Sequence, residues 1–406
     1  MSTKKKFILD VVINMLGFGL YIIAQQIILL PLISKYTNDV VFSNIVIYIS
    51  ILNIICNSTG GELGNARIVR DEKYESTNSK IGDFTYILTM LSPMIVIICF
   101  IIFSILKYTI LQSIVLISTI LMANIRLYSA SYFRLNKKFN YVVIQNVLYL
   151  IGAIIGIGLM YLFDNIYLAI LFPELFSIIF SLKKSDLVEM KLKRTINFKE
   201  TLKVFTQFGI ISLITNCMVY FDRLLIYPIL GATSVSVYYA ASSMSKVSSL
   251  ATNPISSVLL SWIAKAKESK KNAILKKLLL VNIPLVIGIT LFNIPVTYIA
   301  VRILYGQYLQ ECIPLIIPLA FATAFSCSTF LTKSVLLKFT DAKYLIYIYI
   351  VHFVFFSIIG YFLSVKFGLY GFTIANLISK IELWISFVLL IIVTTQNKKE
   401  VSEVSG

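Results

Sequence analysis

The sequence predicts an all-α integral membrane protein with about twelve transmembrane helices in two six-helix lobes and both termini in the cytoplasm. Three observations lead to this: the composition, the regular recurrence of apolar runs, and the distribution of basic residues. Of 406 residues, 58% are hydrophobic and 14% are charged, whereas a soluble domain is about half apolar and a quarter charged. A net charge of +17 is typical of nucleic-acid-binding proteins, but few polar residues remain to build a solvated basic face. The composition therefore excludes a soluble enzyme, a nucleic-acid binder and a disordered chain.

Apolar runs of the length that crosses a bilayer, about 20 residues, recur along the whole chain. Helix is the expected conformation, because backbone groups inside a bilayer must be hydrogen-bonded within the segment. Two of the runs are interrupted by a charge, one by Asp83 and one by Lys246. The twelve predicted spans are 7–33, 41–58, 82–106, 109–129, 140–162, 165–182, 204–230, 235–263, 278–303, 312–336, 344–365 and 369–395.

The basic residues test this count. With a cytoplasmic N-terminus, 29 of the 36 basic residues fall in cytoplasmic segments, including the segment from Arg126 to Lys138, and only 4 fall outside. Three more lie within spans: Arg223, Lys246 and Lys380. Such a bias is what the positive-inside rule predicts for twelve spans.

The chain also resembles itself at about half its length. The segment FDNIYLAI at 163–170 aligns without gaps with FGLYGFTI at 367–374, an offset of 204 residues. An even number of spans in each half indicates a parallel repeat about an axis along the membrane normal. We therefore expect an N-lobe at 1–200 that ends in a cytoplasmic linker at about 183–203, a C-lobe at 201–395, and a cytoplasmic tail at 396–406.

Polar residues recur at helical spacing in the first two spans of each lobe, which places them on one helical face. Such seams either bond one helix to another or line a polar pathway. The seams are Asp10, Asn14, Gly17, Tyr21 and Gln25; Ser50, Asn53 and Asn57; Ser212, Asn216, Tyr220, Arg223 and Tyr227; and Tyr239, Ser242, Lys246, Ser249 and Asn253.

Charged residues within spans are harder to explain by packing alone. A charge at the depth expected for Lys246 or Lys380 costs about 2.5–3.5 kcal/mol on insertion scales. Arg223 lies nearer the outer end of its span, and Asp222 points about 100° away from it on a helix. Glu174 and Glu382 are candidate counter-charges or proton carriers.

No catalytic or metal-binding motif is visible. His352 is the only histidine and is expected to be a packed side chain rather than a proton relay. The five cysteines lack metal-ligand spacing, and no phosphate-binding loop is present. We expect neither cofactor, metal nor enzymatic activity.

The segment DRLLIYPILGATSVSVYYAA at 222–241 resembles the signature of polysaccharide flippases in the multidrug/oligosaccharidyl-lipid/polysaccharide exporter superfamily. The matching positions are Asp222, Arg223, Gly231, Tyr238 and Ala241, with Ser236 standing where the family usually has glycine. Three further segments are similar to that family: GGELGNARIVR at 60–70, YGQYLQECIPLIIPLA at 305–320 and FGLYGFTIA at 367–375.

The resemblance implies a MATE-like fold and a flippase of the O-antigen (Wzx) type in the bacterial inner membrane. Such proteins move an undecaprenyl-pyrophosphate-linked oligosaccharide between leaflets by alternating access, for O-antigen or other surface polysaccharide, and a polymerase and a chain-length regulator are possible partners. We expect Arg223, Lys246 and Lys380 to bind the pyrophosphate, with Asn216, Tyr220 and Tyr227 suited to sugars. The coupling candidates are Asp222, Glu174 and Glu382. The alternatives are a cation-coupled multidrug exporter of the same superfamily and an O-antigen polymerase or membrane glycosyltransferase.

Overall fold

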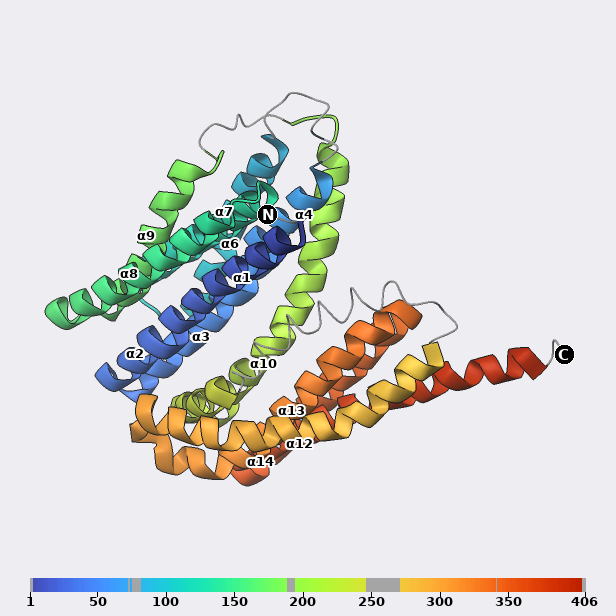
Figure 1. The fold of residues 1–406 in the computed structure, drawn as a ribbon. Coiled ribbons are helices and arrows are strands. Elements are labelled where there is room, and N and C mark those ends of the chain that lie inside the picture. The colour runs from blue at the N-terminus through green and yellow to red at the C-terminus, as the bar shows by residue number, and fades with distance from the viewer. Residues whose placement is uncertain are drawn as a thin grey trace. The chain divides into compact units, whose positions relative to one another are not determined.

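A computed structural model describes residues 3–71, 74, 82–187, 194–245, 271–340 and 342–403 (Figure 1). In these residues helices are joined by short connections. The chain forms two compact units, Met1–Asp222 and Arg223–Gly406. From the sequence we placed the start of the second lobe at residue 201; in the structure the division falls later, inside the helix α10.

The first unit holds the first six predicted spans. Its first two spans each contain a π-helical segment, in which one extra residue is accommodated per turn. The elements are α1 (Thr3–Ile22), η1 (Ile23–Leu29), α2 (Leu30–Tyr36), α3 (Asp39–Cys56), η2 (Asn57–Gly61), α4 (Glu62–Arg70), α6 (Gly82–Ile105), α7 (Ile110–Leu135), α8 (Phe139–Phe163) and α9 (Ile166–Lys184).

Two of the remaining elements are long because each contains two helices. They are α10 (Phe198–Ser245), α12 (Lys271–Leu304), η4 (Gly306–Tyr308), α13 (Leu309–Phe339) and α14 (Ala342–Glu403). A single glycine with positive φ turns the chain within α10, at Gly231 (φ 82°), and within α14, at Gly368 (φ 61°). Ten helices of the described chain are long and apolar enough to cross a membrane. Dividing α10 and α14 at their glycines gives the twelve predicted spans, of which the eighth is described only as far as Ser245.

The turn after the fifth span and the turn after the eleventh each contain a residue with positive φ. Asp164 ends α8 with φ 50°, and Gly368, 204 residues later, has φ 61°. Positive φ is disfavoured for residues other than glycine, asparagine and aspartate. The two aligned positions thus share a positive φ but differ in ψ, which is 41° at Asp164 and −145° at Gly368, so only Asp164 is in the left-handed helical conformation.

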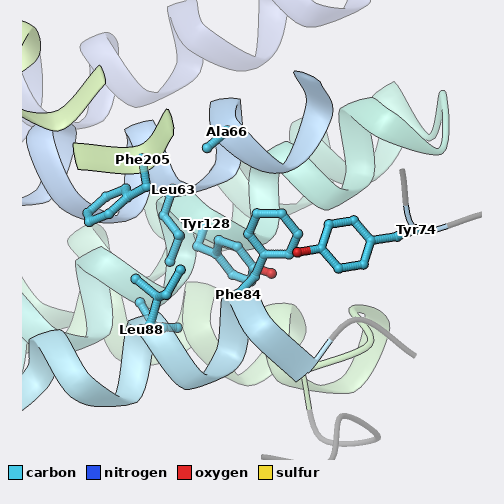
Figure 2. Close-up of a cluster of buried hydrophobic side chains, with 8 residues drawn as sticks. Leu63, Ala66, Tyr74, Phe84, Leu88, Tyr128 and Phe205 are labelled. Carbon is cyan, nitrogen blue, oxygen red and sulfur yellow. The ribbon is translucent and has the colours of Figure 1, made fainter. Parts of the chain in front are cut away.

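A cluster of buried hydrophobic side chains lies between several helices of the first unit (Figure 2). Its members include Leu63 and Ala66 of α4, Phe84 of α6, Tyr128 of α7 and Phe205 of α10. Full burial of Leu63 or Phe84 away from water contributes roughly 1.5–3 kcal/mol each. The cluster fixes α4 and the start of α10 in one body.

Asp83, which interrupts an apolar run in the sequence, lies at the first turn of α6 and is fully buried. Its carboxylate accepts hydrogen bonds from the Tyr74 hydroxyl (2.8 Å) and from the backbone N–H of Thr195 (2.7 Å). Thr195 belongs to the predicted cytoplasmic linker at 183–203. Asp186 of this linker forms an ion pair with Arg67 of α4. The described parts of the predicted cytoplasmic linker are thus bonded to the first unit.

Candidate functional site

The polar seam of the seventh span meets the seam of the second span inside the first unit. The Asn57 amide donates to Oδ1 of Asn216 (3.2 Å), and the Asn216 amide donates to the carbonyl oxygen (2.8 Å) and the Oγ (3.0 Å) of Ser212. The second and seventh spans, whose polar seams were predicted independently, are therefore joined by a chain of side-chain hydrogen bonds.

A cavity of about 260 Å³ lies beside this chain of hydrogen bonds. One wall is α4 and the other is the first half of α10. The lining residues are Glu62, Asn65, Phe208, Ile211, Ser212 and Thr215. Asn65 donates to Oε2 of Glu62 (3.0 Å), which holds the amide and the carboxylate side by side.

The π-helical segment η2 determines which residues of the second span reach this cavity. The N–H of Gly60 and the Thr59 hydroxyl (2.7 Å) both donate to Oδ1 of Asn124 on α7. A Cβ at Gly60 would lie 2.2 Å from the Asn124 carbonyl oxygen, and one at Gly64 would lie 2.1 Å from the Ser131 hydroxyl. Only glycine permits this approach. The face of the second span that carries Gly60 and Gly64 packs closely against α7. Asn57, Glu62 and Asn65 face α10.

A buried ion pair occupies the core of the first unit. Arg126 of α7 and Glu174 of α9 form two parallel hydrogen bonds, Nε to Oε2 (2.7 Å) and a terminal nitrogen to Oε1 (2.9 Å). Their side chains are 5% and 2% exposed. The guanidinium also lies over the rings of Tyr21 (4.8 Å) and Tyr149 (5.1 Å). A bidentate arrangement of this kind is the strongest form of carboxylate pairing.

The sequence reading of Arg126 was wrong. We counted it among the cytoplasmic basic residues, but it lies within α7 and is buried against Glu174. The missed signal was available: a buried carboxylate requires a partner, and both residues fall within predicted spans.

In the second unit, Lys380 and Glu382 are joined through His352. His352 Nδ1 lies 3.0 Å from Oε2 of Glu382, and its Nε2 lies 3.3 Å from Nζ of Lys380. A neutral imidazole with its hydrogen on Nδ1 satisfies both contacts, since it donates to the carboxylate and accepts from the ammonium. His352 also stacks on Phe356, so it is packed as the sequence predicted and bonded to two charged groups as well.

The other predicted cations have different surroundings. Arg223 is 7% exposed and lies 4.7 Å above the ring of Tyr239. Lys246 lies outside the described residues. Asp222 is buried at the end of the first unit. Tyr220 lies in the first unit.

The motif residues serve the local fold. Gly231 makes the turn between the seventh and eighth spans, and Tyr227 lies half-buried one turn before it. The hydroxyl of Tyr238, which is fully buried, accepts a hydrogen bond from the Asn376 amide (2.9 Å). Ala241 is fully buried. The motif therefore shapes the turn and ties the eighth span to the twelfth.

No protein-family model matches the sequence, and a search of curated proteins finds no relative. Solved structures do match over nearly the whole chain. The lipid II flippase MurJ in an inward closed conformation has a TM-score of 0.63 and 16% identity, covering 96% of this chain and 87% of its own. A multidrug resistance MATE family transporter of the MOP superfamily has a TM-score of 0.66 in both its inward-facing form (14% identity, 96% and 95% covered) and its outward-facing form (15% identity, 98% and 97% covered). The chain therefore has the fold shared by the MurJ and MATE transporters.

Proposed function

We propose that the protein flips an undecaprenyl-pyrophosphate-linked oligosaccharide across the bacterial inner membrane by alternating access, as a step in the synthesis of O-antigen or another surface polysaccharide. The fold is shared with the lipid II flippase MurJ. The signature at 222–241 resembles that of polysaccharide flippases.

A fold shared with MATE transporters equally supports a second candidate, a cation-coupled multidrug exporter. The ion pair of Arg126 and Glu174 supports the first candidate. An exporter of cationic drugs requires a deep acidic group that can receive the drug's charge, whereas both oxygens of Glu174 are already bonded to Arg126. A polar, anionic substrate makes no such demand.

The cationic groups proposed to hold the pyrophosphate are Arg223, Lys246 and Lys380. Arginine and lysine are the side chains suited to phosphate oxygens. Lys380 is half-buried, and the imidazole of His352 positions its ammonium. The sugars would contact Asn216, Tyr220 and Tyr227.

Three acidic residues are proposed for coupling to an ion gradient: Asp222, Glu174 and Glu382. Two observations support this role for Glu382: it is 23% exposed, and it contacts the imidazole of His352. Protonation of Glu174 would instead leave the buried guanidinium of Arg126 without a counter-charge. Partners of the proposed flippase would be membrane lipids, a polysaccharide polymerase and a chain-length regulator, and no enzymatic step is proposed.

Transport in proteoliposomes tests the function. Purified protein is reconstituted with a fluorescent undecaprenyl-pyrophosphate-linked saccharide, and the lipid exposed in each leaflet is measured by membrane-impermeant quenching. We expect protein-dependent equilibration, lost in Arg223→Ala and Lys380→Ala. Efflux of ethidium in place of lipid movement would identify the multidrug exporter.

A cellular assay gives the same comparison. In a strain that depends on this protein for surface polysaccharide, Arg223→Ala and Lys246→Ala should abolish the polymer at normal expression. Normal export by both variants would contradict the proposed cationic site.

A further inference from the structure

The cavity between α4 and the first half of α10 has the size of a small, single chemical unit. Its volume is about 260 Å³, below the roughly 300–1,000 Å³ of pockets that enclose drug-sized molecules. One sugar ring with its hydroxyl groups is a unit of this size.

The polar groups of the cavity offer both donors and acceptors. On α4, Oε2 of Glu62 accepts a hydrogen bond from Asn65. Within the described part of the chain, no hydrogen bond occupies Oε1 of Glu62 or the second N–H of the Asn65 amide. The carboxylate also interacts electrostatically with Arg134 of α7, so its charge is partly balanced within the protein.

The α10 wall adds two hydroxyl groups. Oγ of Ser212 accepts a hydrogen bond from Asn216, so its own hydrogen remains to be donated. Oγ1 of Thr215 donates to the backbone carbonyls of Ile211 and Ser212, each at 3.0 Å, so its lone pairs remain to accept. A hydroxyl carries one donor and two acceptor positions.

This mixture distinguishes between classes of ligand. A cation requires acceptors only, and a phosphate requires donors only, whereas a sugar hydroxyl donates and accepts at once. Phe208 and Ile211 supply apolar surface in the same cavity, which suits the C–H faces of a sugar ring. We infer that Glu62, Asn65 and Ser212, with Phe208, form a binding site for one sugar unit of the transported lipid. This inference rests on the proposed function.

The position of the site along α10 indicates from which side of the membrane the sugar would be bound. Ser212 lies 8 residues after the predicted start of the seventh span at 204, or about 12 Å at 1.5 Å per residue, in the first half of a hydrocarbon core about 30 Å thick. The basic linker before Phe198 predicts that this end of the helix is cytoplasmic. The sugar would therefore be bound from the cytoplasmic side, before translocation.

Binding of matched lipids to the purified full-length protein tests the inference. The probes are undecaprenyl pyrophosphate and its derivatives carrying one N-acetylglucosamine, glucose or galactose, titrated in detergent. Wild type should bind at least one sugar-bearing lipid more tightly than the sugar-free carrier. Glu62→Gln should reduce the ratio of the two affinities about tenfold or more, because it removes a charged hydrogen-bonding group. Ser212→Ala should reduce the same ratio. Both variants should bind the sugar-free carrier as wild type does.

The control is Glu311→Gln, which neutralises an exposed carboxylate in the first turn of α13 and should bind all the lipids as wild type does. Unfolding temperatures establish that each variant is folded, and Ser212→Ala removes a single oxygen should Glu62→Gln fail to fold. An equal affinity of wild type for carrier and sugar-bearing lipids overturns the sugar site. Loss of ethidium binding in Glu62→Gln with sugar preference intact shows a cation site instead. Failure of wild type to bind the carrier at all contradicts the proposed function itself.

Discussion

Neutralising Glu174 should destabilise the first unit strongly. Glu174→Gln leaves the guanidinium of Arg126, 5% exposed, without its counter-charge. Breaking a buried ion pair by removing one partner costs about 3–5 kcal/mol. Two features place the expected value near the lower limit: glutamine retains one acceptor, and the rings of Tyr21 and Tyr149 stay over the guanidinium. At about 2–4 °C per kcal/mol for a unit of this size, the midpoint of thermal unfolding should fall by about 6–12 °C.

A double-mutant cycle separates the pair from the cost of an unpaired charge. We expect Arg126→Met and Glu174→Leu to be strongly destabilising singly, and the double variant to regain most of the loss, because apolar side chains can replace a buried pair. A thiol-reactive dye reports unfolding, since all five cysteines are free and four of them are buried. A Glu174→Gln midpoint within about 1 °C of wild type, or additive losses in the double variant, would show that the pair is not coupled as described.

Three further predictions concern the backbone and one phenol. Gly231→Ala should cost about 1–3 kcal/mol, because φ 82° and ψ −179° are open essentially to glycine only; Gly288→Ala, whose Cβ would meet no atom within 4 Å, should unfold at or above the wild-type temperature. Gly60→Ala should lower the unfolding temperature and separate the second span from α7, with the same control, since its Cβ would lie 2.2 Å from a backbone oxygen. Burial raises the pKa of Tyr74 from 10.0 to about 12, so its neutral form stabilises the fold below pH 10 and this contribution is lost as the pH rises towards 12. Between pH 9 and 12, Tyr74→Phe should therefore lose less stability than wild type, whereas Tyr370→Phe, at a half-exposed ring, should behave as wild type; equal losses in all three would contradict the assignment.

Much of the fold could be predicted from the sequence because hydropathy and basic loops are one-dimensional signals. The turn at Gly231 was also predictable, since it belongs to a recognisable motif and only glycine adopts its φ readily. The spans and the glycine turn can both be predicted from residues that are neighbours in the sequence, without knowledge of contacts between distant residues.

The contacts between helices could not be predicted in the same way. Lys380 and His352 are 28 residues apart, and Arg126 and Glu174 are 48 apart, so their pairing depends on how helices pack. The polar seam around Asn216 was predicted, but its neighbour Glu62 was missed. Glu62 follows Asn57 by five residues, and the α-helical periodicity used to find the seams places residues five apart on different faces. The π-helical turn η2, with its extra residue, brings them to the same face.

That extra residue makes the second span sensitive to length as well as to composition. Each residue turns an α-helix by about 100°, so deletion of one position within Asn57–Gly61 would rotate everything after it. Glu62 would leave the cavity, Gly64 would leave Ser131, and Arg67 would leave Asp186, all at once. A homologous chain without the insertion should therefore be aligned with a gap inside the helix, and a gap-free alignment would compare side chains that point in different directions.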